Sequence, residues 1–354
     1  MQSAPSEITT TRLTLRPPLR GDRSLWVGLH RDPALYDHAP WAMPESDDAA
    51  GAEFDDCLGR WAEVGFDYGV VEETMTRAGI GVGGLRRRHH DGEEVLNLYY
   101  RLAAAHHGRG LGKEAARAWT AHALEWLPPL PVVAKSREIN ERSLRAALAA
   151  GLEPAGTTDD GPVGEPPSQV LRAPRVESPT WFDDQTRESV LDLWCAVNDT
   201  GGAVGFLPGA PRHEVASTLA AHEEGMADGG TSAVLLRGTG GRVVGLGFWV
   251  ADPNPLLAHA RTAYRIMTHP EMRGRNLGRL LMAAMHRVAR EQDVEVTVLD
   301  VRSGLGTTRF YEGSGYVEVG RVPGVIRVGP ADDRDSVLMA RRLDGRPMVA
   351  DGRA

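Results

Sequence analysis

The chain has 354 residues, of which 42% are hydrophobic and 25% charged, a composition typical of globular protein and a length that favours two domains. Its formal net charge of -8 has the wrong sign for a protein that coats nucleic acid, so we expect no nucleic-acid partner. Cys57 and Cys195 lie far apart and form no CxxC, which excludes a disulfide framework or a thiolate zinc site within the chain. No apolar run of about 18 residues and no signal-peptide pattern occur, so we expect a cytoplasmic protein that binds no membrane.

Two similar successions of predicted elements follow one another along the chain, which indicates duplicated domains. In the first half the sequence predicts strands over 12–16, 70–71, 79–85, 95–102 and 131–134, helices over 110–126 and 141–150, and a last strand at 169–171. In the second half it predicts strands over 232–236, 243–250, 262–268 and 294–300, and helices over 188–196, 277–288 and 308–312. Residues 173–178 are predicted as a linker.

Each half contains one strand that runs into a basic, glycine-bearing loop and then a helix. The loops are His107-Gly108-Arg109-Gly110-Leu111-Gly112 and Arg273-Gly274-Arg275-Asn276-Leu277-Gly278. Backbone N–H groups at a helix start, together with the positive end of the helix dipole, form a seat for an anion. Glycine lets the backbone approach a phosphate closely, and arginine adds charge and several donors. Both loops are therefore predicted phosphate-binding sites, the alternative being ordinary glycine turns that enter surface helices.

Two common phosphate motifs do not fit the first loop. A Walker A loop would require glycine at His107 and serine or threonine at Glu114. The loose dinucleotide pattern is met by Gly110, Gly112 and Ala115, but Lys135 stands where an acidic residue is expected.

The order strand, [Arg/Gln]-x-x-Gly-x-[Gly/Ala], helix, strand, helix resembles the acetyl-CoA-binding core of the GNAT family of N-acetyltransferases, and it occurs twice. The two copies would cover residues 9–172 and 179–343. Residues 12–156 resemble the ribosomal-protein N-terminal acetyltransferase branch, and residues 190–343 resemble the tabtoxin-resistance type of small-molecule acetyltransferase. The stretches that carry the first resemblance are 12–17, 106–112, 140–143 and 149–152, and those that carry the second are 201–206, 273–278, 299–300, 310–311, 315–316 and 323–324. The resemblance implies an α/β (α+β) fold of two GNAT-like domains, each a mixed, splayed central sheet flanked by helices.

The resemblance also implies roles for single residues. The two loops would bind acetyl-CoA as co-substrate, although His107 stands at the Arg/Gln position and Asn276 replaces the central glycine of the second loop. In the second half, Tyr311 would protonate the leaving sulfur and Asp300 would act as base or hold the substrate ammonium, the rival for Asp300 being a helix cap or salt bridge.

The first half carries two further candidates. Asn140 would contact pantetheine and Ser143 would donate to the CoA sulfur, whereas a local interpretation makes Asn140 the N-cap of a helix. Asn97 and Thr262 stand where relatives carry a carboxylate, so the base of the first half is unassigned. No metal site is expected, because the His89-His90 and His106-His107 pairs lack ligands at metal-binding spacing.

These features together predict an acetyl-CoA-dependent N-acetyltransferase that acts on a primary amine of a small molecule, with self-protection or antibiotic resistance as the leading role. Protein N-termini are the rival substrate. A third hypothesis is an acyl-CoA-binding protein with one degenerate, non-catalytic domain. The sequence leaves the oligomeric state open.

Overall fold

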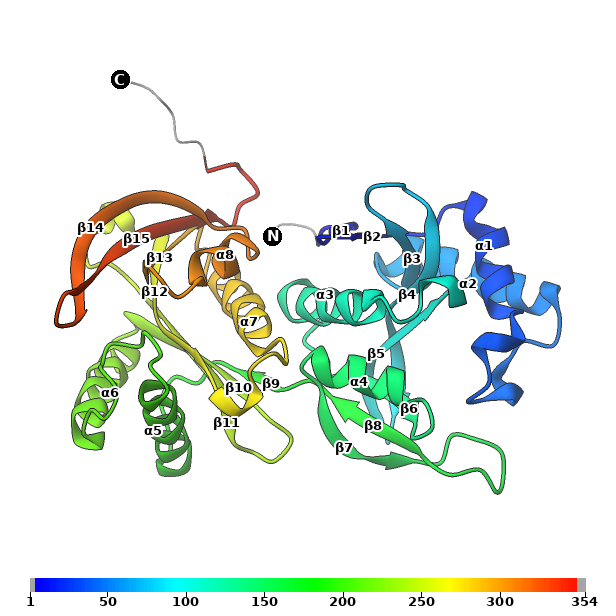
Figure 1. Cartoon of the computed structure of the whole chain (residues 1–354), viewed down its shortest axis with the longest axis horizontal. Helices are drawn as coiled ribbons and strands as arrows, with labels where there is room; N and C mark the ends of the chain where they lie inside the picture. The colour runs from blue at the N-terminus through cyan, green and yellow to red at the C-terminus, as the bar shows by residue number, and fades with distance from the viewer. Residues whose placement is uncertain (1–3, 349–354) are drawn as a thin grey trace. The chain divides into compact units, whose positions relative to one another are not determined.

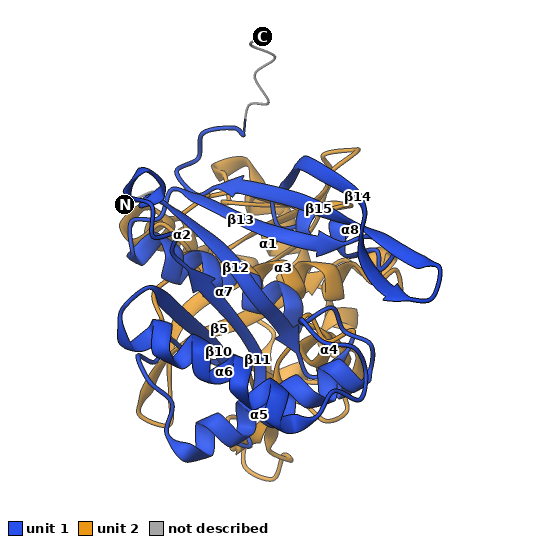
Figure 2. Ribbon diagram, turned by 90° about the vertical axis from the view of Figure 1, so that its left-hand side faces the viewer, with its two compact units in different colours: residues 1–2, 175–273, 277–354 blue, residues 3–174, 274–276 orange. Residues whose placement is uncertain are grey.

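The computed structural model describes residues 4–348 (Figure 1). Between Pro174 and Arg175 the chain divides into two compact units (Figure 2). The first unit in chain order is orange in Figure 2 and includes the tripeptide Gly274–Asn276, and the second is blue. Each unit holds one mixed sheet flanked by helices, which confirms the predicted fold class.

The first unit is built on an eight-stranded sheet in the order β1-β2-β3-β4-β5-β6-β8-β7. Its strands are β1 (Ile8–Thr9), β2 (Leu13–Arg16), β3 (Tyr68–Glu73), β4 (Gly79–His90), β5 (Glu93–Leu102), β6 (Val132–Arg137), β7 (Glu153–Thr158) and β8 (Ser168–Arg172). Its helices are α1 (Arg23–His30), α2 (Asp47–Val64), α3 (Leu111–Trp126) and α4 (Glu141–Ala149).

The second unit is built on a seven-stranded sheet in the order β14-β15-β13-β12-β11-β10-β9. Its strands are β9 (Arg175–Glu177), β10 (Thr231–Arg237), β11 (Val243–Val250), β12 (Ala260–Thr268), β13 (Val296–Arg302), β14 (Val317–Gly329) and β15 (Asp332–Arg342). Its helices are α5 (Asp184–Asp199), α6 (Arg212–Ala227), α7 (Leu277–Glu291) and α8 (Thr307–Glu312).

In each sheet one neighbouring pair of long strands is parallel, and that pair separates early. β5 and β6 pair only at Leu96↔Val132 and Asn97↔Val133, although both strands continue. β12 and β13 pair over four positions that end at Ala263↔Leu299. Beyond these points the facing strand edges have no partner strand, so each sheet opens into a gap lined by backbone hydrogen-bonding groups.

The helices cover both faces of each sheet because successive residues of a strand point to opposite faces. On β11, Trp249 donates its indole N–H to the Met285 carbonyl of α7 at 2.8 Å, whereas Phe248 stacks on His222 of α6 at 4.3 Å. Every side chain of the α7 stripe 277, 280, 281, 284, 285 and 288 is buried, as its helical periodicity predicts. On β5, Tyr100 and Tyr99 face α3 and α1 in the same alternating way.

Several elements differ from the sequence prediction. Three residues of the predicted linker form β9, which pairs with β10 through Leu235↔Glu177, so the second sheet begins at Arg175. The polar segment over 212–227 is the helix α6, whose buried stripe is limited to Val215, Leu219 and Met226 and gives a weak helical pattern. The strands β7, β14 and β15 were not predicted. Pro154 and Gly156 interrupt the alternation of β7, glycines and exposed valines interrupt that of β14, and β15 opens with four charged residues, 332–335.

Leu246→Ala tests the second core, since Leu246 is fully buried at the centre of β11. We expect the free energy of unfolding of the second unit to fall by about 2–5 kcal/mol, because the change removes buried methyl groups and leaves a cavity. Urea unfolding followed by circular dichroism measures the loss. The matched control, Leu256→Ala, alters a leucine that is 79% exposed and should change stability by less than about 0.5 kcal/mol; equal losses in the two variants would contradict the assignment of this core.

Candidate functional site

The two predicted phosphate loops have the same backbone conformation. Gly108 and Gly110 both have φ of 76°, and the matching residues of the second loop, Gly274 and Asn276, have φ of 79° and 66°. All four lie in the left-handed region, where asparagine is the best-tolerated residue after glycine. Asn276 therefore preserves the turn that glycine makes in the first loop.

Each loop leads directly into a helix, α3 or α7, at the open end of the parallel strand pair. The first N–H groups of a helix have no partner within it, and they carry the positive end of the helix dipole. Arg109 and Arg275 lie on the exposed side of these turns and add positive charge. The arrangement is chemically suited to a polyphosphate whose remainder extends into the gap between the strands.

Close packing requires a further glycine in each loop, Gly112 in the first and Gly278 in the second. A Cβ at Gly112 would lie 2.7 Å from the Tyr100 ring, and a Cβ at Gly278 would lie 3.1 Å from the Phe310 ring. The aromatic ring of a neighbouring element thus rests on the first turn of each helix. The repeated spacing of the two loops reflects this shared packing as well as the shared turn.

The remaining residues of the first loop hold it to the sheet. The Nε2–H of His107 donates to the Leu102 carbonyl at the end of β5, at 2.8 Å, and its Nδ1 accepts from Arg142 at 3.3 Å. Arg109 pairs with Glu73 at 2.9 Å. Arg12, which opens the predicted motif at 12–17, donates its Nε to Glu114 in the first turn of α3 at 2.7 Å.

Asn140 and Ser143 lie at the start of α4, next to the gap between β5 and β6. The side-chain oxygen of Asn140 accepts from the Ser143 backbone N–H at 3.2 Å, so Asn140 is the N-cap of α4. The Ser143 hydroxyl is hydrogen-bonded to Tyr100, whose pKa is raised to about 12 by burial. Ser143 therefore has a neutral, protonated phenol as its neighbour, and the predicted contact with a CoA sulfur stays a prediction.

Tyr311 and Asp300 occupy different environments in the second unit. Burial raises the pKa of Tyr311 to about 12, and no side chain or backbone group within residues 4–348 hydrogen-bonds to its hydroxyl. Asp300 is exposed on β13, one position beyond the last parallel pair, and accepts a hydrogen bond from Ser336. A protonated phenol suits a proton donor, while an exposed carboxylate suits a contact with an ammonium group.

A polar and aromatic network that the sequence did not reveal lies on the α1 side of β5. Asn97 donates to the Tyr68 hydroxyl at 2.7 Å, and the next residue on this face, Tyr99, donates its hydroxyl to His30 Nε2 at 3.2 Å. Arg101 in turn donates to the Tyr99 oxygen at 2.9 Å. These contacts join residues 29 and 69 positions apart in the chain, so no local motif could have identified them.

The His30 ring of this network is neutral. Its Nδ1–H donates to the Trp26 carbonyl at 2.9 Å, which leaves Nε2 as the acceptor for Tyr99. Burial lowers the pKa of His30 to about 4, and the nearby charges of Arg101 and Arg86 lower it further.

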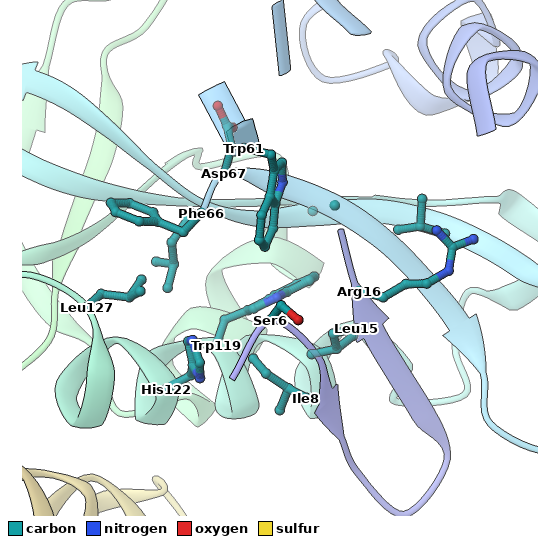
Figure 3. Close-up of a pocket in the computed structure, with 14 residues that line it drawn as sticks. Ser6, Ile8, Leu15, Arg16, Trp61, Phe66, Asp67, Trp119, His122 and Leu127 are labelled. Carbon is teal, nitrogen blue, oxygen red and sulfur yellow. The ribbon is translucent and has the colours of Figure 1, made fainter. Parts of the chain in front are cut away.

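Two hollows in the structure lie away from the loops. The first, drawn in Figure 3, has room for about two water molecules in ≈ 30 Å³ and is lined by residues of β1 to β4, α2 and α3, among them Trp61, Trp119 and His122. The second, of ≈ 590 Å³, lies beside β9 and the start of α5. No predicted site residue lines either one.

Within residues 4–348, no three His, Cys, Asp or Glu side chains are grouped so that they could hold a metal ion. The helices of this same range are all too short or too polar to cross a membrane.

Two family models match the chain, and both describe an acetyltransferase (GNAT) domain. One covers residues 12–153 and the other residues 208–324. The chain carries two GNAT acetyltransferase domains in tandem. It therefore belongs to this family and is an N-acetyltransferase, and acetyltransferases of the GNAT fold use acetyl-CoA. The first and second units are its first and second GNAT domains.

Solved structures resemble parts of the chain. A ribosomal-protein-alanine N-acetyltransferase from Brucella melitensis is 17% identical, with a TM-score of 0.40, over 47% of this chain and 98% of that one. A GCN5-related N-acetyltransferase from Kribbella flavida is 18% identical, with a TM-score of 0.39, over 47% and 97%. An acetyltransferase from Agrobacterium tumefaciens is 25% identical, with a TM-score of 0.38, over 49% and 96%. No curated protein sequence matches the chain.

His30 predicts a pH dependence of the stability of the first GNAT domain. An unfolded histidine binds a proton below about pH 6.5, whereas folded His30 binds one only near pH 4. The contribution of neutral His30 is therefore complete above about pH 6.5 and is lost as the pH falls toward 4, by up to about 3 kcal/mol. Urea unfolding of the wild type and of His30→Gln at pH 7.5, 6.0 and 4.5 should give curves that converge toward low pH.

The control is His89→Gln, which alters an exposed ring on β4. Its difference from the wild type should stay constant with pH. A constant difference for His30→Gln as well would show that folding does not lower the pKa of His30 and would contradict the prediction.

Proposed function

We propose that the protein transfers the acetyl group of acetyl-CoA to a primary amine of a small molecule, and that each GNAT domain has a donor site at its own loop. The observation that supports this most is the repeated left-handed turn, at Gly108 and Gly110 and again at Gly274 and Asn276, placed where a parallel strand pair opens. In both domains this turn presents the first backbone N–H groups of a helix to the opening, as an anion seat requires.

The proposed reaction is a direct transfer. The neutral amine nitrogen attacks the thioester carbonyl carbon, a C–N bond forms, the C–S bond breaks, and CoA leaves as a thiolate. The amine proton passes to water or to a carboxylate, for which Asp300 is the candidate in the second domain. Tyr311 supplies a proton to the thiolate and regains one from solvent, because its raised pKa keeps the phenol protonated at neutral pH. In the first domain, Ser143 is the proposed donor to the sulfur, supported by Tyr100.

The side chains opposite α3 in the first domain favour a small acceptor over a peptide. Tyr36 and Tyr68 are only 3% and 7% exposed, and the Arg101 guanidinium lies 3.6 Å from the centre of the Tyr36 ring. Both rings belong to the buried core cluster on this side of the sheet, which supports a small acceptor over an extended chain. A peptide N-terminus is the alternative acceptor, supported by the resemblance of residues 12–156 to the ribosomal-protein N-terminal acetyltransferase branch.

We further propose a cytosolic location and a role in resistance or self-protection. The location is supported by two cysteines that are both free, with the Cys57 thiol buried and its pKa raised to about 12 by burial. An acyl-CoA-binding protein with one inactive domain is the remaining alternative, since the second loop carries Asn276.

Isothermal titration with acetyl-CoA tests the two donor sites. We expect two sites per chain in the wild type and one in each of Arg109→Glu and Arg275→Glu, because each reversal places a negative charge beside one proposed phosphate seat. Both side chains are exposed, so the fold should survive. Arg88→Glu, an exposed arginine on β4, should keep both sites; a single site in the wild type would mean that only one domain binds the donor.

Tyr311→Phe tests the proton donor of the second domain. We expect kcat to fall by about 10²-fold or more with little change in KM for acetyl-CoA, because general acid catalysis contributes about 10²–10⁴-fold. The rate is measured as CoA release in the Arg109→Glu background, which isolates the second site. An unchanged kcat would remove Tyr311 from the mechanism.

The acceptor class is tested by CoA release with three groups of compounds: amino acids, simple amines, and peptides with free N-termini. Turnover of small amines at rates at least tenfold above those of peptides supports the proposal. The opposite ranking supports the N-terminal alternative, and acetyl-CoA binding without turnover of any group supports the binding protein.

A further inference from the structure

Arg265 of the second domain lies directly beyond the point where β12 and β13 separate. The last parallel pair is Ala263↔Leu299, and Arg265 follows two residues later with φ of 54°. The register of β11 and β12 shifts at this position, so the strand bulges and turns the Arg265 side chain out of the regular alternation. The bulge directs the guanidinium toward the α5 side of the sheet, where it lies 5.5 Å from the Trp194 ring.

The Arg265 guanidinium is only partly satisfied by the protein. One terminal nitrogen donates to the Val204 carbonyl at 3.2 Å, while its Nε is buried without a hydrogen-bond partner. Within residues 4–348, no carboxylate lies at ion-pair distance from it. Burial lowers the pKa of Arg265, which reflects the cost of keeping this charge away from water.

The aromatic neighbours of Arg265 provide no counter-charge. His222 stacks on Phe248 and has a pKa lowered to about 4, first by burial and then by the charge of Arg265. The ring is therefore neutral at physiological pH. Tyr264, the residue before Arg265, is 44% exposed, so this side of the site is open to solvent.

Two other arginines also donate hydrogen bonds to the loop over 200–206, which lies next to Arg265. Arg273 donates to the Thr200 hydroxyl at 3.1 Å and Arg302 donates to the Gly201 carbonyl at 3.2 Å. Neither of them has a carboxylate partner in the described part of the chain. The acidic side chain nearest to this loop in sequence, Asp199, accepts from the Gly209 N–H at 3.2 Å. The loop thus gathers positive charge that no protein carboxylate neutralises.

Gly205 allows the guanidinium to approach the loop. A Cβ at this position would lie 2.0 Å from a terminal nitrogen of Arg265, and φ of 102° favours glycine. The loop backbone therefore packs directly on the charged group. A half-buried guanidinium without a counter-charge is costly unless an anion binds at its accessible side, and its planar shape matches a carboxylate.

We propose that Arg265 binds the carboxylate of an amino-acid-like acceptor in the second domain and thereby holds the acceptor amine near the gap between β12 and β13. This inference rests on the proposed acetyl transfer and adds to it the chemical class of the acceptor. Arg265 is a substrate-binding residue in this proposal and takes no part in proton transfer.

Titration calorimetry of the CoA-saturated protein with L-amino acids and with their primary amides tests the proposal, because each amide differs from its acid only in the missing negative charge. In the wild type we expect at least one acid to bind at least tenfold more tightly than its amide. In Arg265→Met this preference should disappear, while CoA affinity stays the same. Arg265→Lys should retain part of the preference, since lysine keeps the charge without the planar pair of donors.

The matched control is Arg261→Met on the same strand, because Arg261 donates only to the carbonyls of Ala258 and Ala260. This variant should keep the preference for the acid. The proposal is overturned if no acid binds more tightly than its amide, if the preference survives in Arg265→Met, or if Arg261→Met loses it equally.

CoA release from acetyl-CoA with the same acids and amides separates this inference from the proposed function. Release at equal rates with acids and amides would leave the transferase in place and remove the role of Arg265. Binding of an acid that depends on Arg265, without CoA release by any compound, would instead remove the proposed transfer and leave an anion site.

Discussion

The proposed donor sites of both domains depend on one constraint, the early separation of a parallel strand pair. β5 and β6 share two paired positions, and β12 and β13 share four. A parallel pair that stayed together would satisfy its own backbone groups and close the sheet. Separation leaves backbone donors and acceptors along the facing edges, which only a ligand or water can satisfy. The glycine loop at the open end then supplies the amide groups and the helix dipole that an anion requires.

The loops illustrate which parts of the site can be predicted from sequence. Their spacing follows from two local requirements. Positions 108, 110, 274 and 276 must adopt the left-handed conformation, and Gly112 and Gly278 must leave room for an aromatic ring. A pattern in a single sequence is therefore enough to predict the loops. The capping role of Asn140 is local as well and was one of the two interpretations offered for it. The α7 helix was predicted from the helical spacing of its apolar residues, and all residues of that stripe are buried.

The groups on the face proposed for the acceptor were harder to predict, because they depend on register and tertiary packing. The bonds from Asn97 to Tyr68 and from Tyr99 to His30 exist only once β5, β3 and α1 are assembled. Arg265 is placed by a bulge, and a sequence gives no signal for a bulge at a residue other than glycine. The strand β9 was assigned to the linker for a similar reason, since its three residues become a strand only by pairing with β10.

The two domains differ most in the charge and exposure of the face that lies opposite the loop helix. In the first domain, Arg86 is neutralised by Asp67 at 2.6 Å, and Arg101 is held by the Tyr99 hydroxyl and the Leu35 carbonyl. Aromatic rings cover both cations, although Nη2 of Arg86 is buried without a hydrogen-bond partner. In the second domain, Arg265 keeps a donor unused beside an exposed tyrosine. The two domains thus share the turn of the loop and differ in the solvent exposure of this face. Arg101 and Arg265 both lack a carboxylate partner within residues 4–348, but buried rings cover Arg101, whereas Arg265 lies beside the exposed Tyr264. The proposed anionic acceptor is therefore assigned to the second domain.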